Sequence, residues 1–144
     1  MKVVIVGSGY VGLTIGACLA AHGNQVTCID IDPNIVELLN SGRIHIHEEG
    51  LQKIVDRSVK TGDLKFTTDL KTAVSNAAVT FIAVGTPSDV DGSADLKYVC
   101  KAAEQVGEAI EQSENGKLHI VVTKSTVPVG TGDEVEKIIK SKTS

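Results

Sequence analysis

Apolar and polar positions along the chain form alternating blocks that predict strands and helices in turn. Short runs rich in Val and Ile predict strands, and between them apolar residues recur at helical spacing. Because strands that alternate with helices build parallel βαβ units, the pattern predicts an α/β fold with a doubly wound parallel sheet. The predicted strands, about five in all, are residues 3–6, 25–29, 64–68, 79–84 and 118–123.

Residues that commonly cap helices mark the expected helix starts. Asp32 followed by Pro33 forms an N-cap and first-turn pair for a helix over residues 34–40. Thr131 and Glu134 form a capping-box pattern for the last helix. The other expected caps are Thr68 or Asp69 for a short helix and Ser93 for a long one.

The first apolar run leads directly into a loop of the form G-x-G-x-x-G that begins a helix. Gly7 allows the tight turn, Gly9 lets the backbone approach a pyrophosphate, and Gly12 lets the helix pack closely on the strand. The free N–H groups near Tyr10 and Val11 lie at the positive end of the helix dipole. This strand, loop and helix therefore predict a dinucleotide-binding site.

An acidic residue follows the loop at the spacing that dinucleotide folds use. Asp30 ends the second apolar run, where a carboxylate accepts hydrogen bonds from the adenosine ribose hydroxyls. A carboxylate there repels the 2′-phosphate of NADP, so we expect NAD as the cofactor. Asp32 is the alternative ribose ligand, but its position before Pro33 favours the capping role.

Four polar or glycine-rich segments follow the predicted strands at their carboxyl ends. They are Gly7–Gly12, Asp30, Gly85–Pro87 and Ser125–Thr126. Open α/β sheets bind ligands at this edge, where the order of the strands reverses. We therefore expect these segments to form one ligand site.

Composition narrows the classes of protein that fit. With 144 residues, 42% hydrophobic and 3% aromatic, the chain suits one domain, residues 1–144, built on a sheet of Val, Ile and Ala. The net charge is −4 without a basic cluster, so we expect neither nucleic acid nor an anionic membrane as a partner. Apolar runs are too short to span a bilayer and the N-terminus resembles a strand, so we expect a cytoplasmic protein.

The cysteines and histidines predict no further chemistry. Cys18, Cys28 and Cys100 lie in apolar stretches without paired spacing, and we expect reduced thiols buried in the core. His45 and His47 alternate on an extended segment, but no third fixed ligand is evident, so we expect no metal site.

Several stretches together resemble the N-terminal, NAD-binding domain of the UDP-glucose/GDP-mannose dehydrogenase family. The resemblance covers essentially the whole chain, and its last two stretches are specific to the family rather than general to Rossmann-like folds. Glu49 departs from it, since the family usually has Pro there. The matching stretches are residues 7–12, 30–32, 48–51, 81–87, 91–96 and 124–131.

The resemblance implies an enzyme that oxidises the C6 alcohol of a nucleotide sugar to a carboxylate and reduces two NAD. It places Thr126 beside the nicotinamide as a catalytic residue whose hydroxyl binds a water or the reacting oxygen. It also makes cofactor contacts of Thr86 and Ser125, with Gly85 and Pro87 beside them. The simpler alternative is that Thr86 and Thr126 are turn residues that satisfy the backbone.

The resemblance also implies that parts of such an enzyme lie outside these 144 residues. The family's nucleophilic Cys motif has no match, and its catalytic Glu, Lys and Asn and its central and C-terminal sugar-binding domains are absent. We therefore expect this chain alone to bind NAD without catalysis. In the family a further strand follows, so 118–123 becomes an exposed edge that favours self-association, and the full enzyme is expected to be a homo-oligomer.

Three functions remain open at this point. The leading one is the NAD-binding part of an enzyme that converts UDP-glucose to UDP-glucuronate. The second changes the sugar to GDP-mannose or an N-acetylated UDP-sugar. The third is a stand-alone NAD-binding module without chemistry.

Overall fold

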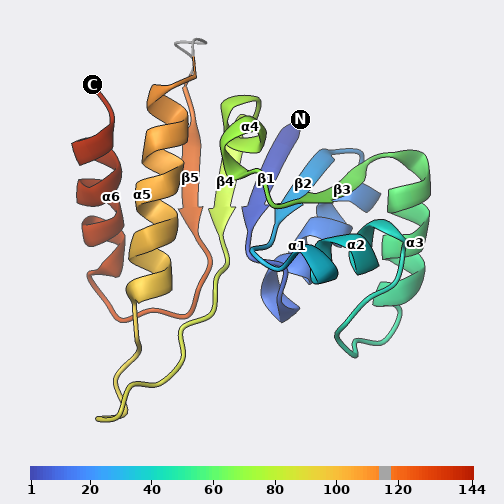
Figure 1. Ribbon diagram of the computed structural model, residues 1–144, viewed down its shortest axis with the longest axis horizontal. Coiled ribbons are helices and arrows are strands. Elements are labelled where there is room, and N and C mark those ends of the chain that lie inside the picture. Colours follow the sequence, from blue (N-terminus) through green and yellow to red (C-terminus); the bar gives the residue numbers. More distant parts are fainter. Residues whose placement is uncertain (114–117) are drawn as a thin grey trace.

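The computed structural model describes residues 1–113 and 118–144 and contains one parallel sheet between two layers of helices (Figure 1). The strands lie in the order β3-β2-β1-β4-β5, which confirms the predicted doubly wound sheet. In chain order the elements are β1 (Lys2–Val6), α1 (Tyr10–Ala21), β2 (Gln25–Ile29), α2 (Pro33–Asn40), α3 (Leu51–Thr61), β3 (Leu64–Thr67), α4 (Leu70–Ser75), β4 (Val79–Ile82), α5 (Lys97–Glu111), β5 (Ile120–Thr123) and α6 (Thr131–Lys142).

The alternation of β1 divides the core into two layers. Val3 and Ile5 pack with buried residues of α1, α2 and α3 on one face of the sheet. Val4 and Val6 pack with α4, α5 and α6 on the other. Because β1 pairs with both β2 and β4, the chain crosses the sheet between β3 and β4, and the strand order reverses beside β1.

Two of the expected helix caps are confirmed. The Asp32 carboxylate accepts a hydrogen bond from the Asn34 backbone N–H at 2.9 Å, with Pro33 in the first turn. The Asp69 carboxylate accepts from the Thr72 N–H at 3.1 Å. Aspartate at an N-cap satisfies a backbone donor that the helix leaves unpaired.

The expected cap at Ser93 is wrong. Helix α5 begins at Lys97, whose N–H donates to the Asp95 carboxylate at 3.0 Å. The Ser93 hydroxyl instead donates to Asp91 at 2.6 Å. A neighbouring carboxylate competes for this hydroxyl, so Ser93 stabilises the turn rather than the helix.

The capping box at Thr131 is also wrong. Helix α6 follows Gly130, which adopts a left-handed φ of 93° and forms no side-chain cap. Thr131 is the first helical residue, and its buried hydroxyl donates back to the Pro128 carbonyl at 2.8 Å. The turn chemistry before the helix therefore replaces the capping box.

The three cysteines do not share one environment. Cys28 is fully buried in β2, and burial, with a smaller contribution from the nearby Asp30 carboxylate, raises the pKa of its thiol to about 12. Cys100 is partly buried, whereas Cys18 on α1 is exposed, so the expectation of a core position is wrong for Cys18. Its helical position faces solvent, on the side of α1 away from the sheet.

Within the described part of the chain, no helix combines the length and apolar character needed to cross a membrane.

His119 lies just before β5 and is half-buried against a polar group inside the sheet. Its Nε2 lies 2.9 Å from the hydroxyl of Thr80, which is fully buried. Burial lowers the pKa of His119 from its usual 6.5, and a hydrogen bond to the Ala77 backbone opposes this shift in part. Folding therefore favours the neutral imidazole.

The histidine predicts how stability depends on pH. Between the lowered pKa of folded His119 and 6.5, the unfolded chain binds more protons than the folded one. Above pH 6.5 the shifted pKa of His119 therefore does not affect the free energy of unfolding. As the pH drops through 6.5, the free energy of unfolding decreases. Urea unfolding measured from about pH 8 to about pH 5 should show this fall. The His119→Gln variant should show a smaller fall, and an equal fall in the variant would contradict the assignment.

Candidate functional site

The loop between β1 and α1 adopts a conformation that requires glycine at its first position. Gly7 has a left-handed φ of 102°, and a Cβ there would lie 2.6 Å from the carbonyl oxygen of Ala83, the residue after β4. Gly9 is different, because a Cβ built on it meets no atom within 4 Å. The space beside Gly9 is therefore open to a ligand, as expected of a backbone that approaches a pyrophosphate.

Helix α1 lies close to the sheet with its N-terminus at this opening. A Cβ on Gly12 would lie 1.8 Å from the Gly7 carbonyl oxygen, and one on Gly16 would lie 2.6 Å from Cys28 Sγ. Gly9 is the N-cap and gives the helix no side-chain cap. The first-turn N–H groups near Tyr10 and Val11, both exposed, are therefore available for an anion.

Asp30 lies directly after β2, next to the glycine loop. Its Oδ1 accepts a hydrogen bond from the Asp32 N–H at 3.0 Å, and its Oδ2 accepts one from the Ser8 hydroxyl. Ser8 is buried, with 1% of its surface exposed. No sequence signal indicates this role of Ser8, because the contact depends on how close the loop lies to the end of β2.

A cavity of about 400 Å³ lies between the glycine loop and Asp30, whereas Tyr10, Val11 and Gly12 lie outside its lining. Gly7, Gly9 and Asp30 line one side, and Gly85 lines it from the loop after β4. The opposite wall comes from α5 and contains residues that the sequence analysis missed. These are Tyr98, Lys101 and Gln105, whose i, i+3 and i+7 spacing places them on one face of the helix. Ile31 and Leu70, from other segments, complete the lining that was missed.

The loops after β4 and β5 extend from the carboxyl edge of the sheet (Figure 1). Side-chain hydrogen bonds join these two loops. The Thr86 hydroxyl donates to the Thr126 carbonyl at 2.9 Å, and the Ser125 hydroxyl donates to the Val84 carbonyl at 2.7 Å. The structure thus brings these predicted site residues together, but Thr86, Pro87, Ser125 and Thr126 lie outside the cavity lining.

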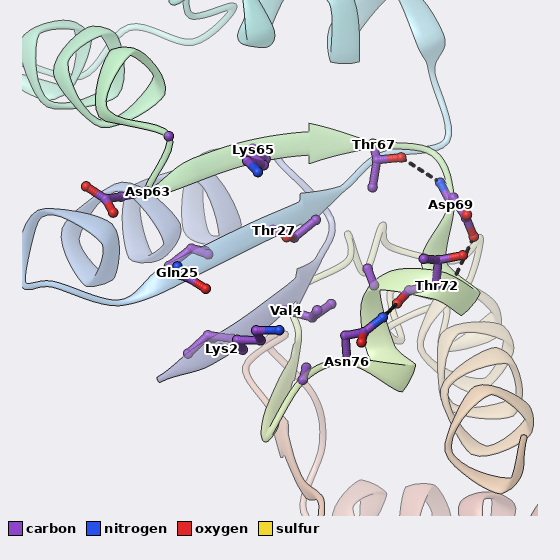
Figure 2. Close-up of a pocket in the computed structure, with 15 residues that line it drawn as sticks. Lys2, Val4, Gln25, Thr27, Asp63, Lys65, Thr67, Asp69, Thr72 and Asn76 are labelled. Atoms are coloured by element: carbon purple, nitrogen blue, oxygen red, sulfur yellow. Dashed lines mark hydrogen bonds between the residues drawn. The ribbon is translucent and has the colours of Figure 1, made fainter. Parts of the chain in front are cut away.

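A second hollow, of about 350 Å³, lies along the face of β1, β2 and β3 beside α4 (Figure 2). Polar and apolar residues both line it, and the polar ones from the strands include Gln25, Thr27 and Lys65. Several polar groups here are already paired, since the Thr67 hydroxyl accepts from the Asp69 N–H at 3.1 Å. No residue of the glycine loop lines it, so the site is the cavity at the carboxyl edge.

Comparison with known proteins agrees with this geometry. A family model described as the NAD binding domain of the UDP-glucose/GDP-mannose dehydrogenase family matches residues 1–144. A UDP-glucose 6-dehydrogenase of Rhizobium meliloti is 50% identical over 141 residues, which are 97% of this chain and 31% of that protein.

Two solved structures share the fold. A GDP-mannose dehydrogenase from Pseudomonas aeruginosa, solved as a ternary complex, superposes with a TM-score of 0.95 at 38% identity, over 99% of this chain and 33% of that one. A UDP-glucose dehydrogenase from Pyrobaculum islandicum superposes with a TM-score of 0.91 at 42% identity, over 97% and 32%. The chain thus spans about a third of the length of these relatives.

The residues present also fit the cofactor. The open space at Gly9 and the uncapped N–H groups at the start of α1 match a pyrophosphate. The Asp30 carboxylate matches a ribose, and the apolar cavity beside it matches an adenine. The resemblance seen in the sequence is confirmed, as is NAD as the cofactor. The chain belongs to the UDP-glucose/GDP-mannose dehydrogenase family, of which it forms the NAD-binding domain.

Proposed function

We propose that this chain is the cofactor-binding part of an NAD-dependent nucleotide-sugar 6-dehydrogenase that acts on UDP-glucose. The observation that carries the proposal is the convergence of the glycine loop, Asp30 and the loop after β4 on one cavity at the carboxyl edge of the sheet. The sugar chemistry belongs to the longer relatives, of which the chain spans about a third.

Within this proposal the chain's own residues divide the work of binding NAD. The N–H groups near Tyr10 and Val11 bind the pyrophosphate, and Asp30 accepts hydrogen bonds from the adenosine ribose. Ile31 and Tyr98 supply apolar surface to the adenine ring. NAD held by these residues would supply the acceptor for the hydride that leaves the sugar carbon.

The 50% identity to one UDP-glucose 6-dehydrogenase supports UDP-glucose, but others of that activity are 38% to 47% identical and overlap with a GDP-mannose 6-dehydrogenase at 40%. The two UDP-glucose dehydrogenases compared above are 50% and 42% identical to this chain, and the GDP-mannose enzyme is 38% identical. GDP-mannose is the second candidate, because that enzyme has the higher TM-score of the two solved structures. An N-acetylated UDP-sugar and a stand-alone NAD-binding module are the remaining alternatives.

We propose Thr126 as the catalytic residue of this chain. The Thr86 hydroxyl donates to the Thr126 carbonyl at 2.9 Å, which holds the backbone at this point without using the Thr126 hydroxyl. Thr126 is exposed, just after β5 at the ligand edge of the sheet. Its hydroxyl can therefore bind a catalytic water or the reacting oxygen of the sugar.

We also infer that the 144-residue chain associates with itself through the edge of its sheet. Strand β5 is an edge of the sheet, and Ile120 at its start is half exposed. An apolar edge strand with free backbone groups favours pairing with another chain. This feature supports self-association through β5.

Titration with cofactors tests the proposed role of Asp30. Calorimetry should show saturable binding of NAD and weaker binding of NADP by the folded chain. Asp30→Asn should raise the Kd for NAD roughly 10- to 100-fold, because charge-assisted hydrogen bonds to the ribose are lost, and should narrow the gap to NADP. Asp32→Asn is the matched control and should bind like the wild type, since asparagine also caps helices. Equal binding of NAD by wild type and Asp30→Asn would contradict the assignment.

Two glycines of the loop should respond differently to alanine. Gly9→Ala should change the free energy of unfolding by less than about 1 kcal/mol, because its Cβ meets open space, but should weaken NAD binding by more than about tenfold. Gly12→Ala should lower the free energy of unfolding by about 1–3 kcal/mol or more, because its Cβ meets backbone. Urea unfolding and calorimetry measure both effects. Unchanged NAD binding in Gly9→Ala would show that the pyrophosphate does not approach this position.

The 144-residue chain should bind NAD without oxidising UDP-glucose. The family's covalent step needs an activated thiolate, but the Cys28 thiol is buried with a pKa of about 12, and burial beside Glu134 and Glu104 raises the pKa of Cys100. Cys18 lies on α1, away from the cavity lining. Absorbance should show no NADH when the chain is mixed with NAD and UDP-glucose. NADH formation that scales with the chain and is lost in Thr126→Ala would contradict this expectation.

A further inference from the structure

Ser8 occupies the position between the first two glycines of the loop and belongs to the lining of the cavity. Its hydroxyl donates a hydrogen bond to Oδ2 of Asp30, 22 positions along the chain. Only 1% of its surface is exposed. A serine in a loop commonly bonds to nearby backbone, whereas this hydroxyl bonds to a carboxylate in the segment after β2.

The Asp30 carboxylate is held at both of its oxygens. Oδ2 accepts from the Ser8 hydroxyl, and Oδ1 accepts from the Asp32 N–H at 3.0 Å. Each carboxylate oxygen can accept two hydrogen bonds, so these contacts leave one acceptor position on each oxygen. Asp30 lines the cavity, so the two remaining positions suit the two hydroxyls of a ribose.

We propose that Ser8 is a positioning residue that fixes the orientation of the Asp30 carboxylate and thereby sets both affinity for NAD and discrimination against NADP. The inference rests on the proposed function, because it requires Asp30 to hold the cofactor ribose. The terminal torsion of aspartate is broad when nothing restrains it. The bond from Ser8 removes that freedom before the cofactor arrives, and an acceptor held in place in advance binds more tightly.

The backbone makes Ser8 an effective anchor for this bond. The Gly7 N–H donates to the Ile29 carbonyl at 2.9 Å, which links the loop to the end of β2. Gly7 directly precedes Ser8, and Ile29 directly precedes Asp30. Two neighbouring bonds therefore join the loop to the strand end. The group that contacts the pyrophosphate and the group that contacts the ribose are held at a fixed separation.

Fixing the Asp30 carboxylate also lowers the affinity for NADP. A carboxylate that cannot rotate stays where the 2′-phosphate of NADP would have to lie. The two negative charges then repel each other strongly, because the site is partly buried. A carboxylate released from Ser8 can turn away from the phosphate. Loss of the Ser8 hydroxyl should therefore weaken NAD binding and reduce the preference for NAD over NADP.

The test compares NAD, 2′-deoxy-NAD (lacking the adenosine 2′-hydroxyl) and NADP by calorimetry on the 144-residue chain. Ser8→Ala should lose about tenfold in affinity for NAD and less for 2′-deoxy-NAD, and its preference for NAD over NADP should narrow. In an Asp30→Ala background the same change should have no effect, because Ser8 acts through Asp30. Ser58→Ala is the matched control, since Ser58 is also buried but lies on α3, away from the cavity.

The outcomes separate this proposal from the one on which it rests. If the wild type binds NAD and 2′-deoxy-NAD equally well, Asp30 does not hold the 2′-hydroxyl of the ribose, and the proposed role of Asp30 fails. If the wild type discriminates and Ser8→Ala discriminates equally, the role of Ser8 is overturned and that of Asp30 stands. An equal loss for NAD and 2′-deoxy-NAD, or a loss that persists with Asp30→Ala, shows a purely structural Ser8 and also overturns it. Ser8→Gly removes the same hydroxyl without added volume and replaces Ser8→Ala if that variant fails to fold.

Discussion

The close approach of α1 to the strand before it is the constraint on which the site depends. A side chain at Gly12 would collide with the Gly7 carbonyl, and one at Gly16 would collide with the Cys28 sulfur. With hydrogen in place of these side chains, the helix lies against β1 and β2 with its N-terminus at the edge of the sheet. Its unpaired N–H groups then face the opening beside Gly9, so packing and anion binding have the same cause.

The reversal of strand order gives the cavity two walls of different chemistry. The side of β1 and β2 contributes the glycine loop and the Asp30 carboxylate, whereas α5 on the other side contributes Tyr98 and Lys101. The chain crosses from one side to the other through α4, which has only six residues. Such a short helix covers little of β2 and β3, and the exposed face carries polar side chains, which accounts for the second hollow (Figure 2).

The parts of the site that the sequence predicted are those set by local backbone. The glycine loop and Asp30 have fixed places relative to a strand end, so their spacing is visible in the sequence. The Ser8 bond and the α5 wall were missed because they depend on how distant segments pack. Ser93 shows the same limit within a loop, because the choice between a helix cap and the Asp91 carboxylate depends on where the loop turns. Cys18 fails for a related reason, since an apolar stretch does not show which face of α1 meets the sheet.

The hydroxyl groups of Thr86 and Ser125 stabilise the loops around the proposed catalytic residue, Thr126. Both residues resemble the family's cofactor contacts, but their hydroxyls donate to carbonyls of the neighbouring loop, those of Thr126 and Val84. These bonds join the loops after β4 and β5, which otherwise extend from the sheet as long connections (Figure 1). A reacting group gains rate from being held in place before the substrate arrives, and loops that are tied to each other hold it better than free ones. The two hydroxyls therefore support the site through the position of Thr126, and a direct contact with the cofactor would have to come from their remaining acceptor positions.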